Sequence, residues 1–132
     1  MSRPSKFAVS TNRAPKAIGP YSAGIKTDHF VFTAGQLGII PETGSLIEGG
    51  VENETRQSLQ NVQNILEAAG SSLDLVVKTT VFLRDMNDFA RMNSIYAEFF
   101  TENPPARSTV QVAALPKGAA VEIEAIALLA GE

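Results

Sequence analysis

The chain has 132 residues, of which 44% are apolar and 19% are charged, and its formal net charge is −3. The length and composition are typical of one globular domain, which we expect to span 1–132 with 1–13 as a loosely ordered N-terminal segment. The acidic balance disfavours nucleic-acid binding, which needs a basic face, and the lack of cysteine excludes disulfides, a thiol nucleophile and cysteine-based metal sites.

The first part of the chain predicts a pair of strands. His29–Thr33 is rich in β-branched and aromatic residues, which favour a strand. A turn at Lys26–Asp28 would pair this strand with residues around Ile25. Pro41–Gly44 is a turn signal, and one short extra strand can be accommodated between 39 and 46.

A long helix is predicted from about Glu52 to Ala69. Glu52 and Glu54 suit its first turn, where the helix dipole favours acidic side chains, and Gly70 suits the position just past its end. The apolar residues that recur at helical spacing are Leu59, Val62, Ile65, Leu66 and Ala69.

Val76–Leu83 predicts another strand, and a second helix follows it. On one side of the strand we expect Val77, Thr79, Val81 and Leu83. Asp85 or Asn87 can cap the helix, and Pro104-Pro105 ends it. The buried stripe of this helix would be Phe89, Met92, Tyr96 and Phe99.

Two strands complete the chain, Ser108–Ala113 and Val121–Leu129, joined through Pro116 and Gly118. The predicted order is therefore β-β-α-β-α-β-β. A sheet covered on one face by two helices is the simplest packing of these elements.

The last strand has an unusual alternation. Its odd positions are apolar or small and suit the face beneath the helices: Val121, Ile123, Ala125, Ala127 and Leu129. Its even positions begin polar and become apolar halfway: Glu122, Glu124, Ile126 and Leu128. A solvated face would stay polar along its length, so we hypothesise that a second copy of the chain covers this face.

No apolar stretch approaches the roughly 20 residues that span a bilayer. The segment Met1–Ala14 is polar and basic, without the apolar core of a secretory signal. We therefore expect no membrane contact and a cytoplasmic location, with a trimmed organelle precursor as the open alternative.

Several standard catalytic sites are absent from the sequence. His29 is the only histidine, which excludes a His-rich metal site, and no Gly-x-Ser-x-Gly elbow or phosphate-binding loop occurs. Gly35–Gly38 is too short a match for a dinucleotide fingerprint.

One cation and two carboxylates are left as candidates. Arg107 opens a predicted strand, where its planar guanidinium could hold a carboxylate by two hydrogen bonds. Glu122 and Glu124 lie on the unusual face of the last strand and could position or deprotonate a water. A structural ion pair or a solvated charge is the alternative for each.

The sequence resembles the reactive intermediate deaminase family, also called the RidA or YjgF family. The similar segments follow the family's order from about 14 to 127: Ala17–Gly24, Thr33–Gln36, Arg56–Leu59 with Asn61-Val62, Val77–Phe82, Asn87–Phe89 with Asn93, Pro105–Ser108, and Val121–Ala125.

The resemblance implies a chorismate-mutase-like α+β fold, with two helices on one face of the sheet, and a homotrimer with a central barrel. It implies active sites at the subunit interfaces, a small 2-imino acid substrate, and no metal or cofactor. The implied reaction is hydrolysis of 2-iminopropanoate and 2-iminobutanoate, the tautomers of 2-aminoacrylate and 2-aminocrotonate, to 2-oxo acids and ammonia.

By the same resemblance, Arg107 should clamp the substrate carboxylate. Glu122, rather than Glu124, should hold or activate the attacking water. Tyr21 should lie beside the substrate and orient it or its water.

The resemblance also implies a substrate-binding set. Main-chain groups near Gly35 and Thr109 should meet the imine nitrogen and the carboxylate, and Asn93 and Phe89 should shape the pocket. The chain departs from the family at Ala34, where serine is common, and at Thr109, where cysteine is common. If the main chain makes these contacts, neither departure should abolish activity.

Functions from other classes stay open at this point. A non-catalytic trimer that binds a small carboxylate metabolite would use the same cleft and would still need Arg107. Ribonuclease or translation-inhibitor activity and a protein-holding role are attributed to some relatives, and the acidic balance weighs against the ribonuclease.

Overall fold

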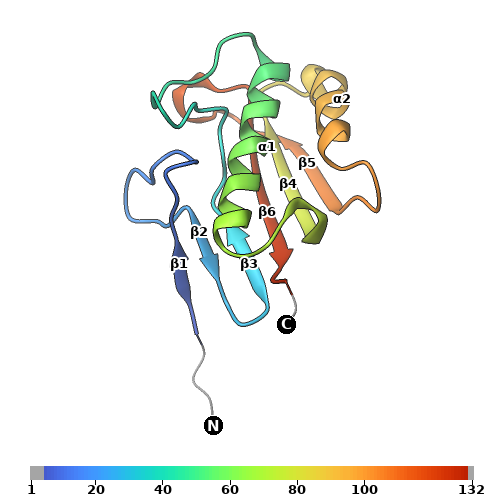
Figure 1. The fold of residues 1–132 in the computed structure, drawn as a ribbon. Helices are drawn as coiled ribbons and strands as arrows, with labels where there is room; N and C mark the ends of the chain where they lie inside the picture. The colour runs from blue at the N-terminus through green and yellow to red at the C-terminus, as the bar shows by residue number, and fades with distance from the viewer. Residues whose placement is uncertain (1–4, 131–132) are drawn as a thin grey trace.

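This computed structural model describes residues 5–130, which form one six-stranded sheet with two helices on the same face (Figure 1). The strands are β1 Phe7–Val9, β2 Gly24–Lys26, β3 Phe30–Thr33, β4 Val76–Leu83, β5 Ala106–Gln111 and β6 Val121–Leu128. The helices are α1 Val51–Ala68 and α2 Phe89–Phe99, and the short 3-10 turns are η1 Leu73–Leu75, η2 Met86–Asp88 and η3 Pro116–Gly118. The predicted α+β class is confirmed.

The sheet has the order β1-β2-β3-β6-β4-β5, so the last strand of the chain is a central one. It pairs antiparallel with β3 and with β4. Strands β4 and β5 are parallel, and α2 is the crossover that a parallel pair requires. The predicted pairing around Ile25 is confirmed, since Ile25 lies opposite Phe32.

Helix α1 ends as the sequence predicts. Gly70 has a φ of +89°, the left-handed conformation that glycine adopts without a steric penalty. The Ser71 N–H donates to the Leu66 carbonyl at 2.8 Å, and the Gly70 N–H donates to the Glu67 carbonyl at 3.1 Å. This pair of hydrogen bonds is a Schellman motif.

The hydrophobic core lies between the sheet and the two helices. Its largest fully buried apolar side chains are Leu59, Ile65, Leu66 and Val62 of α1, Met92 of α2, and Leu83, Ile123, Val31, Val81 and Val121 of the strands. The odd residues of β6 face this core, and the prediction for that strand is confirmed.

The N-terminal prediction needs a correction. Residues 7–9 form the edge strand β1, paired with β2, instead of a loosely ordered segment. Farther along, Ala14 is only 3% exposed. Residues 1–4 of the predicted segment lie outside the described part of the chain.

Four further details differ from the sequence predictions. A β-bulge at Val77 turns this side chain outward, so Val76 takes the buried position instead. Phe89 is 37% exposed, and the buried residues of α2 are Met92, Ile95 and Tyr96. The strand expected at 108–113 runs from 106 to 111. The extra strand is a single bridge between Ile39 and Leu46.

The second face of the sheet carries no helix among residues 5–130 (Figure 1). Several apolar side chains are exposed in the strands that form it, including Phe32 at 41%, Leu128 at 40% and Val110 at 43%. The rings of Phe30 and Phe32 lie together there, with centroids 6.3 Å apart. None of the described helices is long and apolar enough to cross a membrane.

Candidate active site

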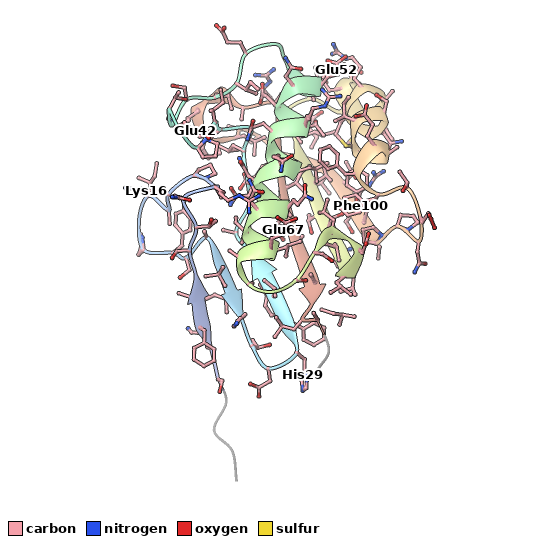
Figure 2. The ribbon with its side chains drawn as sticks, in the orientation of Figure 1. Lys16, His29, Glu42, Glu52, Glu67 and Phe100 are labelled. Carbon is pink, nitrogen blue, oxygen red and sulfur yellow. The ribbon has the colours of Figure 1, made fainter. Side chains whose placement is uncertain are left out.

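A cavity of about 890 Å³ opens beside the start of β6. Its walls come from the loop before β2, the loop after β3 and the η3 turn; Lys16 and Glu42 mark the first two of these loops in Figure 2. Three predicted site residues line it: Tyr21, Gly35 and Glu122.

Gly35 and Glu122 are in close contact. The backbone of Gln36 pairs with Ile123 of β6 through two hydrogen bonds, of 2.8 and 3.0 Å, and this pairing brings Gly35 against the neighbouring Glu122. A Cβ atom on Gly35 would lie 2.0 Å from Oε2 of Glu122. A larger residue here would therefore displace the Glu122 carboxylate from the position it occupies.

The Glu122 carboxyl is half-buried, and this burial raises its pKa above the ordinary value. The negative charge of Glu124 raises the pKa further. Within residues 5–130, Glu122 has no ion-pair partner. A carboxylate that is partly desolvated and free of a cation is suited to accept a proton from water.

Tyr21 lines the cavity and is 53% exposed. Its hydroxyl accepts a hydrogen bond of 3.2 Å from the Ile18 N–H, and its own N–H donates to the Gly19 carbonyl at 2.9 Å. Gly19 has a φ of +126°. The loop thus forms a tight turn that holds the phenol ring beside the cavity.

Helix α1 fixes the loop that carries Gly35. Ser58 donates to the Gln36 carbonyl at 2.7 Å, and the Asn61 amide donates to the Leu37 and Ile39 carbonyls at 3.2 and 2.9 Å. Both side chains are fully buried. Sequence reasoning placed these residues in a helix and in a family motif but did not identify this positioning role.

Glu54 holds the start of β6 in a similar way. Its carboxylate, on a residue only 6% exposed, accepts a hydrogen bond of 2.7 Å from the Ala120 N–H. Gly38 packs on the backbone of Glu54, and a Cβ there would lie 2.7 Å from its Cα. Glu54 lies in the first turn of α1, as predicted, but the sequence did not indicate its hydrogen bond to the start of β6.

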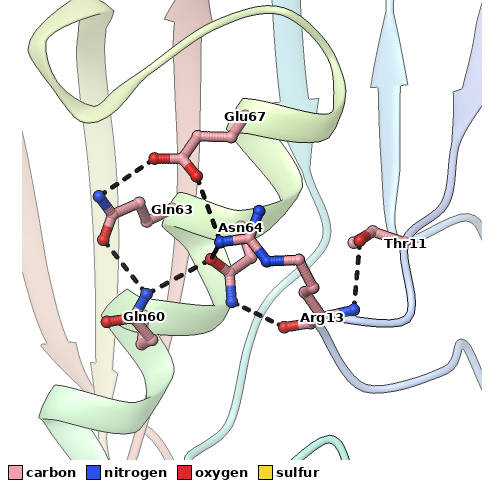
Figure 3. A network of polar contacts seen from close by, with 6 residues as sticks. All are labelled: Thr11, Arg13, Gln60, Gln63, Asn64 and Glu67. Atoms are coloured by element: carbon pink, nitrogen blue, oxygen red, sulfur yellow. Dashed lines mark hydrogen bonds and ion pairs between the residues drawn. The ribbon is translucent and has the colours of Figure 1, made fainter.

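The same helix also holds the loop before the cavity (Figure 3). Asn64 donates to the Arg13 carbonyl at 2.8 Å, and the Arg13 guanidinium donates to the Asn64 side chain at 2.9 Å. Arg13 also lies 3.4 Å from Glu67. Pro15 and Lys16, which follow Arg13, line the cavity.

Arg107 lies elsewhere, on the helix-covered side of the sheet. Its guanidinium carbon is 4.6 Å from the centre of the Tyr96 ring and 5.5 Å from that of Phe89, both on α2. It makes no salt bridge with any carboxylate among residues 5–130. A cation seated on aromatic rings and left unpaired is suited to bind an anion.

The other predicted binding residues accompany Arg107. Thr109 is two residues along β5, which places both side chains on the same face of the strand. Asn93 is four residues after Phe89 in α2, and so lies on the same side of that helix. Neither residue lines the cavity beside Glu122.

The predicted site residues therefore form two groups on opposite faces of the sheet. Arg107 is paired with Thr79, and Thr79 in turn with Ala125, so Arg107 lies two strands and three residues from Glu122. Their Cα atoms are on the order of 14 Å apart, given the usual strand spacing and rise. Because they also point to opposite faces of the sheet, Arg107 and Glu122 of one chain cannot both contact the same three- or four-carbon acid.

Residues 5–130 contain no group of three or more His, Cys, Asp or Glu side chains that could hold a metal ion. The groups that this part of the chain offers for chemistry are a half-buried carboxylate, a phenol and a guanidinium without a carboxylate partner.

The sequence matches the profile of the family described as endoribonuclease L-PSP over residues 11–129. A RutC family protein of Pyrococcus horikoshii is 55% identical over 92% of this chain and 97% of its own length. The human protein named 2-iminobutanoate/2-iminopropanoate deaminase is 51% identical over 91% of this chain and 88% of its own length.

Solved structures of similar sequence have the same fold as this chain. The crystal structure of Escherichia coli TdcF with bound serine has a TM-score of 0.90 and 47% identity, covering 94% of this chain and 99% of TdcF. The E. coli yjgF gene product has a TM-score of 0.88 and 49% identity, covering 92% and 98%.

The fold and the two residue groups define a small α+β protein with a half-buried carboxylate beside a cavity and a separate arginine seated on aromatic rings. The chain belongs to the reactive intermediate deaminase (RidA/YjgF) family, which the endoribonuclease L-PSP profile describes.

Proposed function

We propose that this protein hydrolyses 2-imino acids, with 2-iminopropanoate and 2-iminobutanoate as substrates, to 2-oxo acids and ammonia. The observation that carries the proposal is the half-buried Glu122, whose raised pKa and lack of a cationic partner suit a general base. Relatives from mouse and human, among others, carry the name 2-iminobutanoate/2-iminopropanoate deaminase.

In the proposed reaction, Glu122 takes a proton from a water molecule as the water oxygen attacks the imine carbon. The electron pair of the C=N bond moves to the nitrogen, which takes this proton from Glu122, and a carbinolamine forms. Glu122 then carries the hydroxyl proton of the carbinolamine to the nitrogen as the C–N bond breaks, so that ammonia leaves and the oxygen becomes the carbonyl of the 2-oxo acid. A protonated imine is already electrophilic, so orienting one water can supply several kcal/mol of the acceleration.

The remaining residues have binding roles in this proposal. Arg107 holds the substrate carboxylate through two hydrogen bonds, and Tyr21 orients the substrate or its water. Main-chain groups at Gly35 and Thr109 contact the imine nitrogen and the carboxylate. Asn93 and Phe89 shape the pocket, as their place beside Arg107 favours.

We further propose that the site is shared between subunits of a homotrimer, in which the three helix-free sheet faces form a central barrel. Two observations support this. Arg107 and Glu122 lie on opposite faces within one chain, and the helix-free side of the sheet exposes apolar side chains such as Phe32. A symmetric ring of three would place Arg107 of one subunit near Glu122 of the next.

The activity is tested by coupling a serine or threonine dehydratase to this protein with semicarbazide present to trap free imine. The wild type should slow semicarbazone formation, while Arg107→Ala and Glu122→Ala should not. Arg56→Ala is the matched control, because Arg56 pairs with Glu98 on the surface. If the folded wild type leaves trapping unchanged but still binds 2-oxobutanoate, the protein is a small-carboxylate binder and the enzymatic proposal is wrong.

The shared site is tested by mixing subunits. Arg107→Ala and Glu122→Ala proteins are unfolded together and refolded at equal amounts, with each variant refolded alone as control. Sites built across the interface should regain about one quarter of wild-type activity, because random mixing restores both residues at that fraction of sites. Sites built within one subunit would regain none.

A further inference from the structure

The aromatic ring beneath Arg107 belongs to Tyr96, which sequence reasoning placed in the core. Tyr96 is only 6% exposed, and its ring centre lies 4.6 Å from the guanidinium carbon. Phe89 also approaches that guanidinium, at 5.5 Å, but it is 37% exposed. The closer ring is thus the one held inside the protein.

Tyr96 is itself fixed in place. Its hydroxyl shares a hydrogen bond of 2.7 Å with Thr79 Oγ1, and its ring packs on Phe100 at 4.7 Å between centroids. Thr79 is 1% exposed and lies directly opposite Arg107 in the pairing of β4 with β5. Thr79, Tyr96 and Arg107 therefore form a cluster joined both through the sheet and through side chains.

We infer that Tyr96, anchored by Thr79, is the positioning residue that seats the Arg107 guanidinium for the substrate carboxylate. This inference rests on the proposed function, because that proposal gives Arg107 the carboxylate. Tyr96 acts through Arg107 and need not touch the substrate.

The physical reason is that a free arginine side chain has many rotamers, and ordering it on binding costs free energy. A ring that holds the guanidinium by cation–π attraction removes much of this cost before the substrate arrives. The guanidinium also has no carboxylate partner within residues 5–130, so no acidic side chain there competes for its hydrogen-bond donors.

The test compares three variants with one control. Tyr96→Leu removes the ring, Tyr96→Phe removes only the hydroxyl, and Thr79→Val removes the partner hydroxyl with little change in shape. Ile95→Ala is the control, because Ile95 is a buried residue of the same helix and has neither a ring nor a hydroxyl to offer Arg107. Urea unfolding shows how far each variant is destabilised.

We expect Tyr96→Leu to raise KM for the imine about tenfold, which corresponds to about 1.4 kcal/mol, with kcat within about twofold of wild type. Tyr96→Phe and Thr79→Val should each raise KM about twofold to threefold, and the double variant no more than either alone. Ile95→Ala should lower the free energy of unfolding without raising KM, because destabilisation alone reduces the amount of folded protein and leaves the affinity of each folded molecule unchanged.

Binding of 2-oxobutanoate, measured by calorimetry, separates this inference from the proposed function. If the wild type hydrolyses no imine but Tyr96→Leu weakens 2-oxobutanoate binding about tenfold, the positioning role of Tyr96 is supported and the deaminase proposal fails. If the wild type is active and Tyr96→Leu leaves both KM and 2-oxobutanoate affinity unchanged, Tyr96 does not position Arg107 and the inference is wrong. A wild type that neither hydrolyses imine nor binds 2-oxobutanoate overturns both.

Discussion

Gly35→Ala tests whether Glu122 works from the position seen in the structure. Gly35 does not have a left-handed φ, so alanine suits its backbone. The added methyl group would instead meet Oε2 of Glu122 at 2.0 Å and Cδ at 2.8 Å. The steric cost therefore falls on the flexible end of one side chain.

The geometry sets the size of the effect. Ordinary contact begins near 3.4 Å, so the carboxylate must retreat by about 1.4 Å. Moving a side chain off its preferred rotamer costs about 0.5–1.5 kcal/mol. Replacing glycine by alanine stabilises the fold by about 0.4–1 kcal/mol, because it lowers the conformational entropy of the unfolded chain. Stability should change by less than about 1 kcal/mol, while misplacing a catalytic group by about 1 Å should lower kcat about 100-fold.

The assay is the dehydratase-coupled trapping experiment, run with urea unfolding of the same samples. Gly35→Ala is measured alone and in a Glu122→Ala background. If the methyl group acts only by displacing Glu122, adding it to Glu122→Ala should reduce activity no further.

Two results would refute this reasoning. Full activity of Gly35→Ala would show that the position of the Glu122 carboxylate does not matter for the chemistry. A further loss in the Glu122→Ala background would show that the methyl group blocks something else, such as the approach of substrate to the main chain at Gly35.

Three more predictions concern carboxylates. Because burial and Glu124 raise the pKa of Glu122, kcat/KM should rise with pH through a midpoint above 4.5, and Glu124→Gln should move this acid limb to lower pH. Glu122→Gln should abolish turnover but unfold at higher urea at neutral pH; this gain should vanish below about pH 4.5, since a raised native pKa stabilises the fold only at low pH. Glu54→Ala should cost about 1–3 kcal/mol in urea unfolding by leaving the Ala120 N–H unpaired, whereas Glu54→Gln, which keeps an acceptor, should cost less.

The elements that were predictable from the sequence have strong local signals. Helix α1 shows apolar residues at helical spacing and a terminal glycine, and β6 alternates strictly between two faces. Strand β1 has only three residues and exists because it pairs with β2, which is a non-local contact. The bulge at Val77 was likewise invisible, since one extra residue shifts an alternating pattern without leaving a composition signal.

The residues of the candidate site can be proposed one by one from the sequence, but their arrangement cannot. Arg107 and Glu122 stand out by charge and strand position, yet their separation depends on how β5, β4 and β6 are registered. Tyr96 was assigned to the core because an aromatic residue at helical spacing usually belongs there. Its contact with a guanidinium depends on Arg107, which strand β5 brings over the ring from a later part of the chain.

The buried polar residues of α1 show a signal that could have been used. Glu54, Ser58 and Asn61 recur at helical spacing among the buried residues of the helix, and a buried polar group is costly unless it is hydrogen-bonded. Their partners are backbone groups of the loop after β3 and of the start of β6. A polar stripe inside a core helix therefore indicates that the helix holds a loop.

The positions of Arg107 and Glu122 also bear on how the activity depends on concentration. Both residues are fixed to a continuous hydrogen-bonded sheet, so no loop movement can bring them together within one chain. If both residues act on one substrate, as proposed, catalysis requires two copies of the chain, and activity should follow the fraction of assembled protein. The apolar side chains around Phe32 lead to the same expectation, because an exposed apolar sheet face is stabilised when another chain covers it. Assembly would thus cover this face and also bring an Arg107 and a Glu122 from different chains together.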